Sequence, residues 1–252
     1  MSFESTIPII VLAFVCELVD STLGMGYGTT LTPIMLALGY EPITIVPAVL
    51  FSEAVTGVLA GVLHHEFGNV DLRFGSRDFK VVMTLASLSI VGVLIATIIA
   101  VNVPSWAVKL YIGVLVLALG LFILLNHKRE YSFSLRRIAG LGLLAAFNKG
   151  ISGGGYGPVV TAGQVLSGVR GRNAVGITSL AEGITCVVGV GIYLLSGISL
   201  SWPLVTSLLL GAVLSVPLSA YFVSRLPVSR LTIIIGGIST ALGVYTLIRL
   251  LI

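Results

Sequence analysis

The chain has 252 residues, of which 56% are hydrophobic and 10% are charged, and its formal net charge is +4. Soluble domains carry roughly a quarter charged residues, so this composition excludes a water-soluble globular protein and predicts an integral membrane protein. The basic residues lie in short loops between apolar runs. This distribution excludes a nucleic-acid-binding face and makes the basic residues markers of membrane topology.

The first half of the chain begins with an apolar element over 5–39, interrupted near its middle by the run Gly24-Met25-Gly26-Tyr27-Gly28. Three uninterrupted apolar runs follow, at 43–63, 80–101 and 106–126. Each is about 20 residues long, enough to cross the hydrocarbon layer as a helix that rises 1.5 Å per residue. The interrupted element is predicted to form two helical arms joined at a non-helical tip.

The second half repeats this order after a polar stretch at 127–137. An apolar element over 138–168 is interrupted by Gly153-Gly154-Gly155-Tyr156-Gly157-Pro158 and is again predicted to be two arms with a tip. Three more runs of spanning length follow, at 174–196, 203–223 and 230–251.

The two halves are copies of one unit, because residue n aligns with residue n+129 without a gap through the interrupted element and the following run. The aligned pairs include Gly24 with Gly153, Gly26 with Gly155, Tyr27 with Tyr156, Gly28 with Gly157, Glu53 with Glu182 and Thr56 with Thr185. We therefore predict two repeats, residues 1–126 and 138–252, joined by a cytoplasmic linker at 127–137.

Basic residues predict the direction of each repeat. Eleven lie in four loops: Arg73, Arg77 and Lys80; Lys128, Arg129, Arg136 and Arg137; Arg170 and Arg172; Arg225 and Arg230. The N-terminal tail and the connections at 39–42, 102–105 and 197–201 contain none. The protein is predicted to lie in the cell (inner) membrane. By the positive-inside rule, its basic loops face the cytoplasm and both termini face the outside. This threading requires each interrupted element to enter and leave on the same side of the membrane, the first from outside and the second from inside. The repeats are therefore predicted to be inverted.

The two glycine-rich tips are predicted to form the substrate site. Non-helical backbone at membrane depth is tolerated only where protein or a water-filled cavity satisfies its polar groups. Glycine permits positive φ and close approach of a ligand, and a helix that begins after the tip directs free N–H groups at the site. Such a site favours an anion. The alternative is that the glycines only allow helices to pack closely.

Ionisable residues inside the apolar elements are few: Glu17, Asp20, Glu53, Lys149 and Glu182. Glu53 and Glu182 are equivalent, and a desolvated carboxyl that holds a proton suits coupling or gating; the alternative is a hydrogen-bonded carboxyl that joins helices. Lys149 is the counterpart of Asp20 and precedes the second tip. We expect it to attract the anion, and an Asp20–Lys149 salt bridge is the alternative or the resting state.

The predicted substrate-binding residues are Gly24, Gly26, Tyr27, Gly28, Lys149, Ser152, Gly153, Gly154, Gly155, Tyr156, Gly157, Thr178 and Ser179, with Asp20, Glu53 and Glu182 in coupling or gating. The sequence pairs no nucleophile with a base and has no metal-ligand spacing, so no enzyme activity, cofactor or metal site is predicted. His64 and His65 are expected in a wet inner loop.

The motifs around the tips resemble a known family. Asp20-Ser21 leading into Gly24-x-Gly26-x-Gly28, and the run from Lys149 to Pro158, are similar to the TauE/SafE-type sulfite exporter family of membrane permeases. The resemblance covers nearly the whole chain. It implies transport of small sulfur-containing anions such as sulfite, sulfoacetate or other organosulfonates, usually outward and coupled to the proton gradient, along a path formed by the tips and the segments 47–56 and 176–185.

We therefore predict an all-α polytopic membrane protein of two inverted repeats, a secondary transporter that works by alternating access. A passive anion channel and an importer of a related anion are the alternatives. The expected partners are a small anionic substrate, protons and the lipid bilayer.

Overall fold

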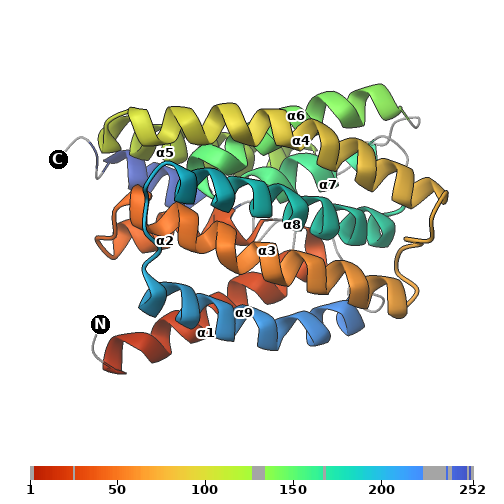
Figure 1. Cartoon of the computed structure of the whole chain (residues 1–252), viewed down its shortest axis with the longest axis horizontal. Coiled ribbons are helices and arrows are strands. Elements are labelled where there is room, and N and C mark those ends of the chain that lie inside the picture. Colours follow the sequence, from red (N-terminus) through yellow and green to blue (C-terminus); the bar gives the residue numbers. More distant parts are fainter. Residues whose placement is uncertain are drawn as a thin grey trace.

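The computed structural model describes residues 3–24, 26–126, 134–166, 169–223, 237, 240–248 and 250. Its main elements are the helices α1 (Phe3–Leu23), α2 (Tyr27–Ala37), α3 (Pro42–Glu66), α4 (Arg77–Asn102), α5 (Ser105–Asn126), α6 (Leu135–Ser152), α7 (Tyr156–Leu166), α8 (Gly171–Leu195) and α9 (Trp202–Phe222) (Figure 1). Residues 240–248 are also helical. The described part of the chain contains no strand, which confirms an all-helical protein.

Five of the six predicted spans appear as single helices: α3, α4, α5, α8 and α9. Half of the remaining predicted span, 230–251, lies outside the described residues, and its described part at 240–248 is helical. In the described part, six helices are long and apolar enough to cross a membrane. Five of them are the helices just named, and the other is α1, with the span Thr6–Leu23. The chain is therefore a multi-pass membrane protein. The 18-residue α6 is not among the six, and it carries Arg136, Arg137 and Lys149.

Both interrupted elements break where the glycines predict, but not at their middle. The first arms, α1 and α6, have 21 and 18 residues, whereas the second arms, α2 and α7, have 11 each. The chain turns through positive φ at Gly24 (64°) and Gly26 (88°), and again at Gly153 (69°) and Gly155 (78°). Side chains with a Cβ rarely adopt these angles, so glycine is required at both tips.

The long helices stack in three layers (Figure 1). The helices α3 and α8 lie against each other in the middle layer, α4 packs along α6 on one side, and α1 packs along α9 on the other. Glycine permits the close approach at each contact. A Cβ on Gly57 of α3 would lie 2.8 Å from the Cα of Gly183 on α8, and one on Gly92 of α4 would lie 2.7 Å from the carbonyl oxygen of Leu143 on α6. These glycines therefore serve helix packing.

The connections gather at two ends of the helix stack. The loops after α2, α4 and α8 lie at the left end in Figure 1, and the loops after α3 and α7 lie at the right end. The right-hand loops carry Arg73 and Arg170, whereas the left-hand loops, at 38–41, 103–104 and 196–201, contain no Lys or Arg. The charge segregation that the sequence analysis used is thus a property of the fold.

Candidate functional site

The two glycine-rich tips meet backbone to backbone in the interior of the protein. A Cβ added to Gly28 would overlap the carbonyl oxygen of Gly153, and one added to Gly157 would lie 2.7 Å from the nitrogen of Gly26. No side chain fits between the tips. The tips that the sequence predicted to form one site are therefore in direct contact, and they leave no space for a substrate in this conformation.

Three of the tip N–H groups already have acceptors. The N–H of Gly26 donates to Asp20 Oδ1 at 2.5 Å, the N–H of Gly154 donates to Ser152 Oγ at 3.1 Å, and the N–H of Gly155 donates to Thr29 Oγ1 at 2.9 Å. These bonds satisfy backbone groups that no helix satisfies. In this conformation, an anion at the tips would have to displace such acceptors.

Lys149 lies at the centre of the charged part of the site. Its ammonium group is fully buried and donates to Glu182 Oε1 at 2.7 Å and to Glu53 Oε2. The expected salt bridge between Asp20 and Lys149 is absent from the ion pairs of the described residues, so this alternative names the wrong partner for Lys149. The fold explains the difference, because α3 and α8 touch at Gly57 and Gly183 and bring both glutamates against α6.

Two further carboxyl groups approach from α1. Carboxylate oxygens of Asp20, Glu53 and Glu182 lie within 4.8 Å of one another. Glu17 Oε1 accepts a hydrogen bond from Ser21 Oγ at 2.6 Å, whereas the buried Glu17 Oε2 has no hydrogen-bond partner among the described residues. We call these four acids, together with Lys149, the carboxylate cluster.

The carboxylate cluster surrounds a cavity of about 10 Å³, the space of roughly one water molecule. Its lining residues are Glu17, Asp20, Ser21, Glu53, Thr56, Gly57, Ser179 and Glu182. Sequence reasoning recognised Glu17 as a deeply placed acid but did not include it in the site. Its spacing of three residues before Asp20, on one face of α1, is the signal that could have placed it there.

The remaining predicted residues support the tips from outside the carboxylate cluster. Thr178 Oγ1 accepts hydrogen bonds from Thr161 Oγ1 at 2.9 Å and from Gln164 Nε2 at 2.8 Å, and a Cβ on Gly24 would overlap the Thr161 side chain. Thr178 thus braces the first tip through Thr161. Tyr27 and Tyr156 are fully buried, and the Tyr156 hydroxyl is 3.2 Å from Ser89 Oγ.

The expectation that His64 lies in a wet loop is wrong. The helix α3 continues to Glu66, so His64 stays on its buried face. His64 Nε2 is 3.0 Å from the Ser21 carbonyl oxygen, and Asn69 Nδ2 is 3.1 Å from His64 Nδ1. Asn69, which sequence reasoning missed, also donates to the carbonyl oxygen of Ala220 at 2.9 Å. The pair fastens the end of α3 to α1 and α9.

An exposed ion pair lies at the other end of α3 from His64. Lys109 Nζ lies 2.8 Å from Glu41 Oε1, and Ser105 Oγ donates to Glu41 Oε2 at 2.5 Å. The hydrogen bonds from Lys109 and Ser105 hold the pKa of the Glu41 carboxyl below its usual range. This contact joins the loop before α3 to the first turn of α5.

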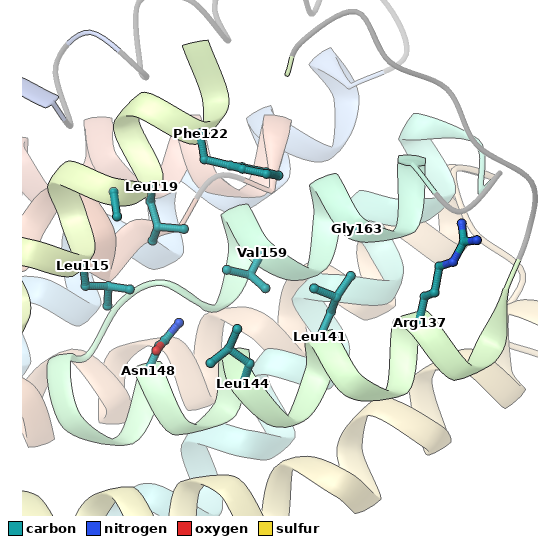
Figure 2. A pocket seen from close by; sticks show the side chains of 10 residues that line it. Leu115, Leu119, Phe122, Arg137, Leu141, Leu144, Asn148, Val159 and Gly163 are labelled. Atoms are coloured by element: carbon teal, nitrogen blue, oxygen red, sulfur yellow. The ribbon is translucent and has the colours of Figure 1, made fainter. Parts of the chain in front are cut away.

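A larger cavity lies apart from the carboxylate cluster, between α5, α6 and α7 (Figure 2). Its volume is about 570 Å³ and its lining is mostly apolar, with Asn148 and Arg137 as polar lining residues. The Tyr111 hydroxyl donates to Asn148 Oδ1. Lys149, the next residue on α6, instead bonds the two glutamates of the carboxylate cluster. The apolar cavity and the charged site are thus on different faces of one helix.

The chain matches known proteins along nearly its whole length. A family model described as sulfite exporter TauE/SafE matches residues 9–246. The "probable membrane transporter protein YtnM" of Bacillus subtilis (strain 168) is 30% identical over 257 residues, which cover 96% of this chain and 83% of that protein. No solved structure matches the chain.

Proposed function

Because the chain belongs to the sulfite exporter TauE/SafE family, we propose that it is a secondary transporter that exports a small sulfur-containing anion, such as sulfite or an organosulfonate. The family is one of membrane transporters, so the chain is a transporter and not an enzyme. The substrate, the direction and the coupling are the parts that we propose.

The placement of Lys149 supports this proposal most directly. Its ammonium is fully buried and is held by two carboxylates. Lys149 lies in the last turn of α6, just before the second tip. A buried cation inside a membrane protein is costly unless it is paired, and such residues mark ion pathways. A bisulfite or sulfonate group carries one negative charge, as a carboxylate does, and presents oxygens that can accept hydrogen bonds from the ammonium. It could therefore replace one glutamate on Lys149.

Paired contacts at the tips support inverted repeats. The contact of Gly28 with Gly153 has its counterpart in the contact of Gly157 with Gly24, because adding 129 to 28 and to 24 gives 157 and 153. A two-fold axis between the tips requires this reciprocity. In addition, Glu53 and Glu182 each lie eleven residues after the first residue of a 25-residue helix.

Transport would follow alternating access. With the ammonium held by both glutamates, the described residues of the two tips are in contact and leave no room for an anion between them. Parting of the tips would expose Lys149, the N–H group of Gly155, and the helix starts of α2 and α7 to the anion. Glu53 and Glu182 would change protonation as the helices move. The rival is a passive anion channel.

Proteoliposomes with the purified protein test this proposal. We expect saturable uptake of radiolabelled sulfite or sulfoacetate that accelerates when unlabelled anion is present on the far side. Lys149→Met should abolish uptake, whereas Lys109→Met, which removes a cation from the exposed pair with Glu41, should retain it. Equal flux of chloride and sulfate without saturation or exchange would identify a channel instead.

A further inference from the structure

The carboxylate cluster carries more acid than base. Glu17 and Asp20 from α1, Glu53 from α3 and Glu182 from α8 approach a single ammonium, that of Lys149. If all four carboxyls were ionised, the cluster would hold three uncompensated negative charges in the membrane interior. Unpaired buried charge costs several kcal/mol per group, so the cluster must hold protons or another cation.

Two buried oxygens indicate where protons reside. Among the described residues, neither Glu17 Oε2 nor Glu53 Oε1 has a hydrogen-bond donor, and both residues line the 10 Å³ cavity. An ionised oxygen in this position would lack a partner, whereas a protonated carboxyl becomes a donor to the neighbouring acids or to a single water. The cavity has no room for a hydrated metal ion, and the Lys149 ammonium already fills the position between Glu53 and Glu182. Protons fit this site better than a metal cation.

The other titratable groups that face the carboxylate cluster do not offset its charge. They are Cys16 from α1, Tyr27 from α2, Tyr156 from α7 and Cys186 from α8, with His64 near the end of α3 against Ser21. Thiols and phenols are neutral at physiological pH. The His64 ring is committed to Ser21 and Asn69.

We propose that the carboxylate cluster is a proton-binding site that must be loaded before Lys149 can bind an anion, so that protons and anion bind together. This inference rests on the proposed function. While Glu53 and Glu182 are both ionised, they occupy Lys149, and an approaching anion meets net negative charge. A proton on either glutamate weakens its hold on the ammonium and removes one repelling charge.

The order of binding sets the direction of coupling. Proton binding strengthens anion binding, and by linkage anion binding takes up protons to the same extent. Both then cross in one direction. An inward proton gradient would drive the anion inward, and export would follow the anion's own outward gradient and carry protons out with it.

Calorimetry on the purified wild-type transporter tests this inference. Isethionate is a suitable probe because its sulfonate stays ionised over the whole pH range. We expect its affinity to fall about tenfold per pH unit as pH rises, the slope of one linked proton. Titrations in two buffers of different ionisation enthalpy should report uptake of at least one proton per anion. Binding without proton uptake, or with proton release, would overturn the inference.

Variants locate the proton. Glu182→Gln removes one partner of Lys149 permanently, so its isethionate affinity should remain high at alkaline pH and its proton uptake should fall. Glu53→Gln, at the equivalent position, should behave alike. Glu66→Gln is the matched control, because this exposed carboxylate ends the helix that carries Glu53 and should leave affinity and uptake unchanged. Unaltered proton uptake in both glutamate variants would remove these residues from the site.

The two proposals fail in different ways. If neither isethionate, sulfite nor sulfoacetate bound at any pH, the proposed function itself would be wrong. If isethionate bound with an affinity that followed sodium concentration at constant pH, the carboxylate cluster would be a metal-cation site. The anion proposal would then stand and the proton inference would fall.

Discussion

Replacing Lys149 with methionine removes the only positive charge of the carboxylate cluster while it keeps a side chain of similar length. The ammonium and its two partners are almost completely buried, with side-chain exposures of 0%, 3% and 5%. Loss of one partner from a buried ion pair costs about 3–5 kcal/mol, because an unpaired charge remains. Here two carboxylates lose the same partner, so we expect the upper part of this range at neutral pH.

This cost depends on pH. As pH falls, the two freed glutamates take up protons and lose their charge, so the destabilisation of Lys149→Met should shrink. We expect the apparent melting temperature in detergent to fall by roughly 8–20 °C at neutral pH and by less than about half of this near pH 5. Thermal unfolding followed by intrinsic fluorescence at both pH values measures the two differences.

A matched variant separates the effect of burying an ion pair from the effect of losing a positive charge. Lys109→Met also breaks an ion pair, but that pair is exposed near the start of α5. Its loss should lower the free energy of unfolding by below about 1 kcal/mol. Glu182→Gln in the Lys149→Met background should recover part of the loss, since only one of the two glutamates that pair with Lys149 then remains charged. If Lys149→Met melted within about 2 °C of Lys109→Met at neutral pH, the ion pairs of Lys149 would not carry the stability that we assign to them.

Three further outcomes are expected. Gly28→Ala should prevent the tips from meeting and abolish transport, because its Cβ would overlap the facing carbonyl oxygen, whereas Gly140→Ala, with open space around it, should transport normally; equal activity would contradict the tip contact. Glu41→Gln should lower the free energy of unfolding by below about 1 kcal/mol at pH 7. Because the pKa of Glu41 is lowered in the folded protein, this difference should shrink as pH falls below the ordinary carboxyl value of about 4.3 and vanish once pH has passed below the lowered pKa of the folded state; a difference that did not shrink would show that the lost charge is not its cause. In a cysteine-free background, Phe74→Cys and Ser199→Cys, both exposed, should react with a membrane-impermeant maleimide from opposite sides only; labelling from one side would refute the inverted threading.

Hydropathy and glycine placement are local properties, and from them the sequence determined the membrane class, five helices to within a few residues, and both tips. A run of about 20 apolar residues has few alternatives to a spanning helix, because the bilayer leaves backbone polar groups no other partner. The positive φ angles at Gly24 and Gly153 follow from the placement of glycine, which adopts them more readily than other residues do. The deep ionisable residues could also be named in advance, since a charge in an apolar run is rare.

The tertiary structure alone decided which of these residues meet. The repeat alignment set Lys149 against Asp20, but the contact of α3 with α8 at Gly57 and Gly183 places two glutamates on Lys149. Likewise, only the packing of the tips decides that the N–H of Gly155, which was expected to be free, donates to Thr29 Oγ1 on the other repeat. Sequence spacing specifies the face of a helix on which a side chain lies. The partner of that side chain depends on how neighbouring helices cross, and this is set by contacts between residues far apart in the chain.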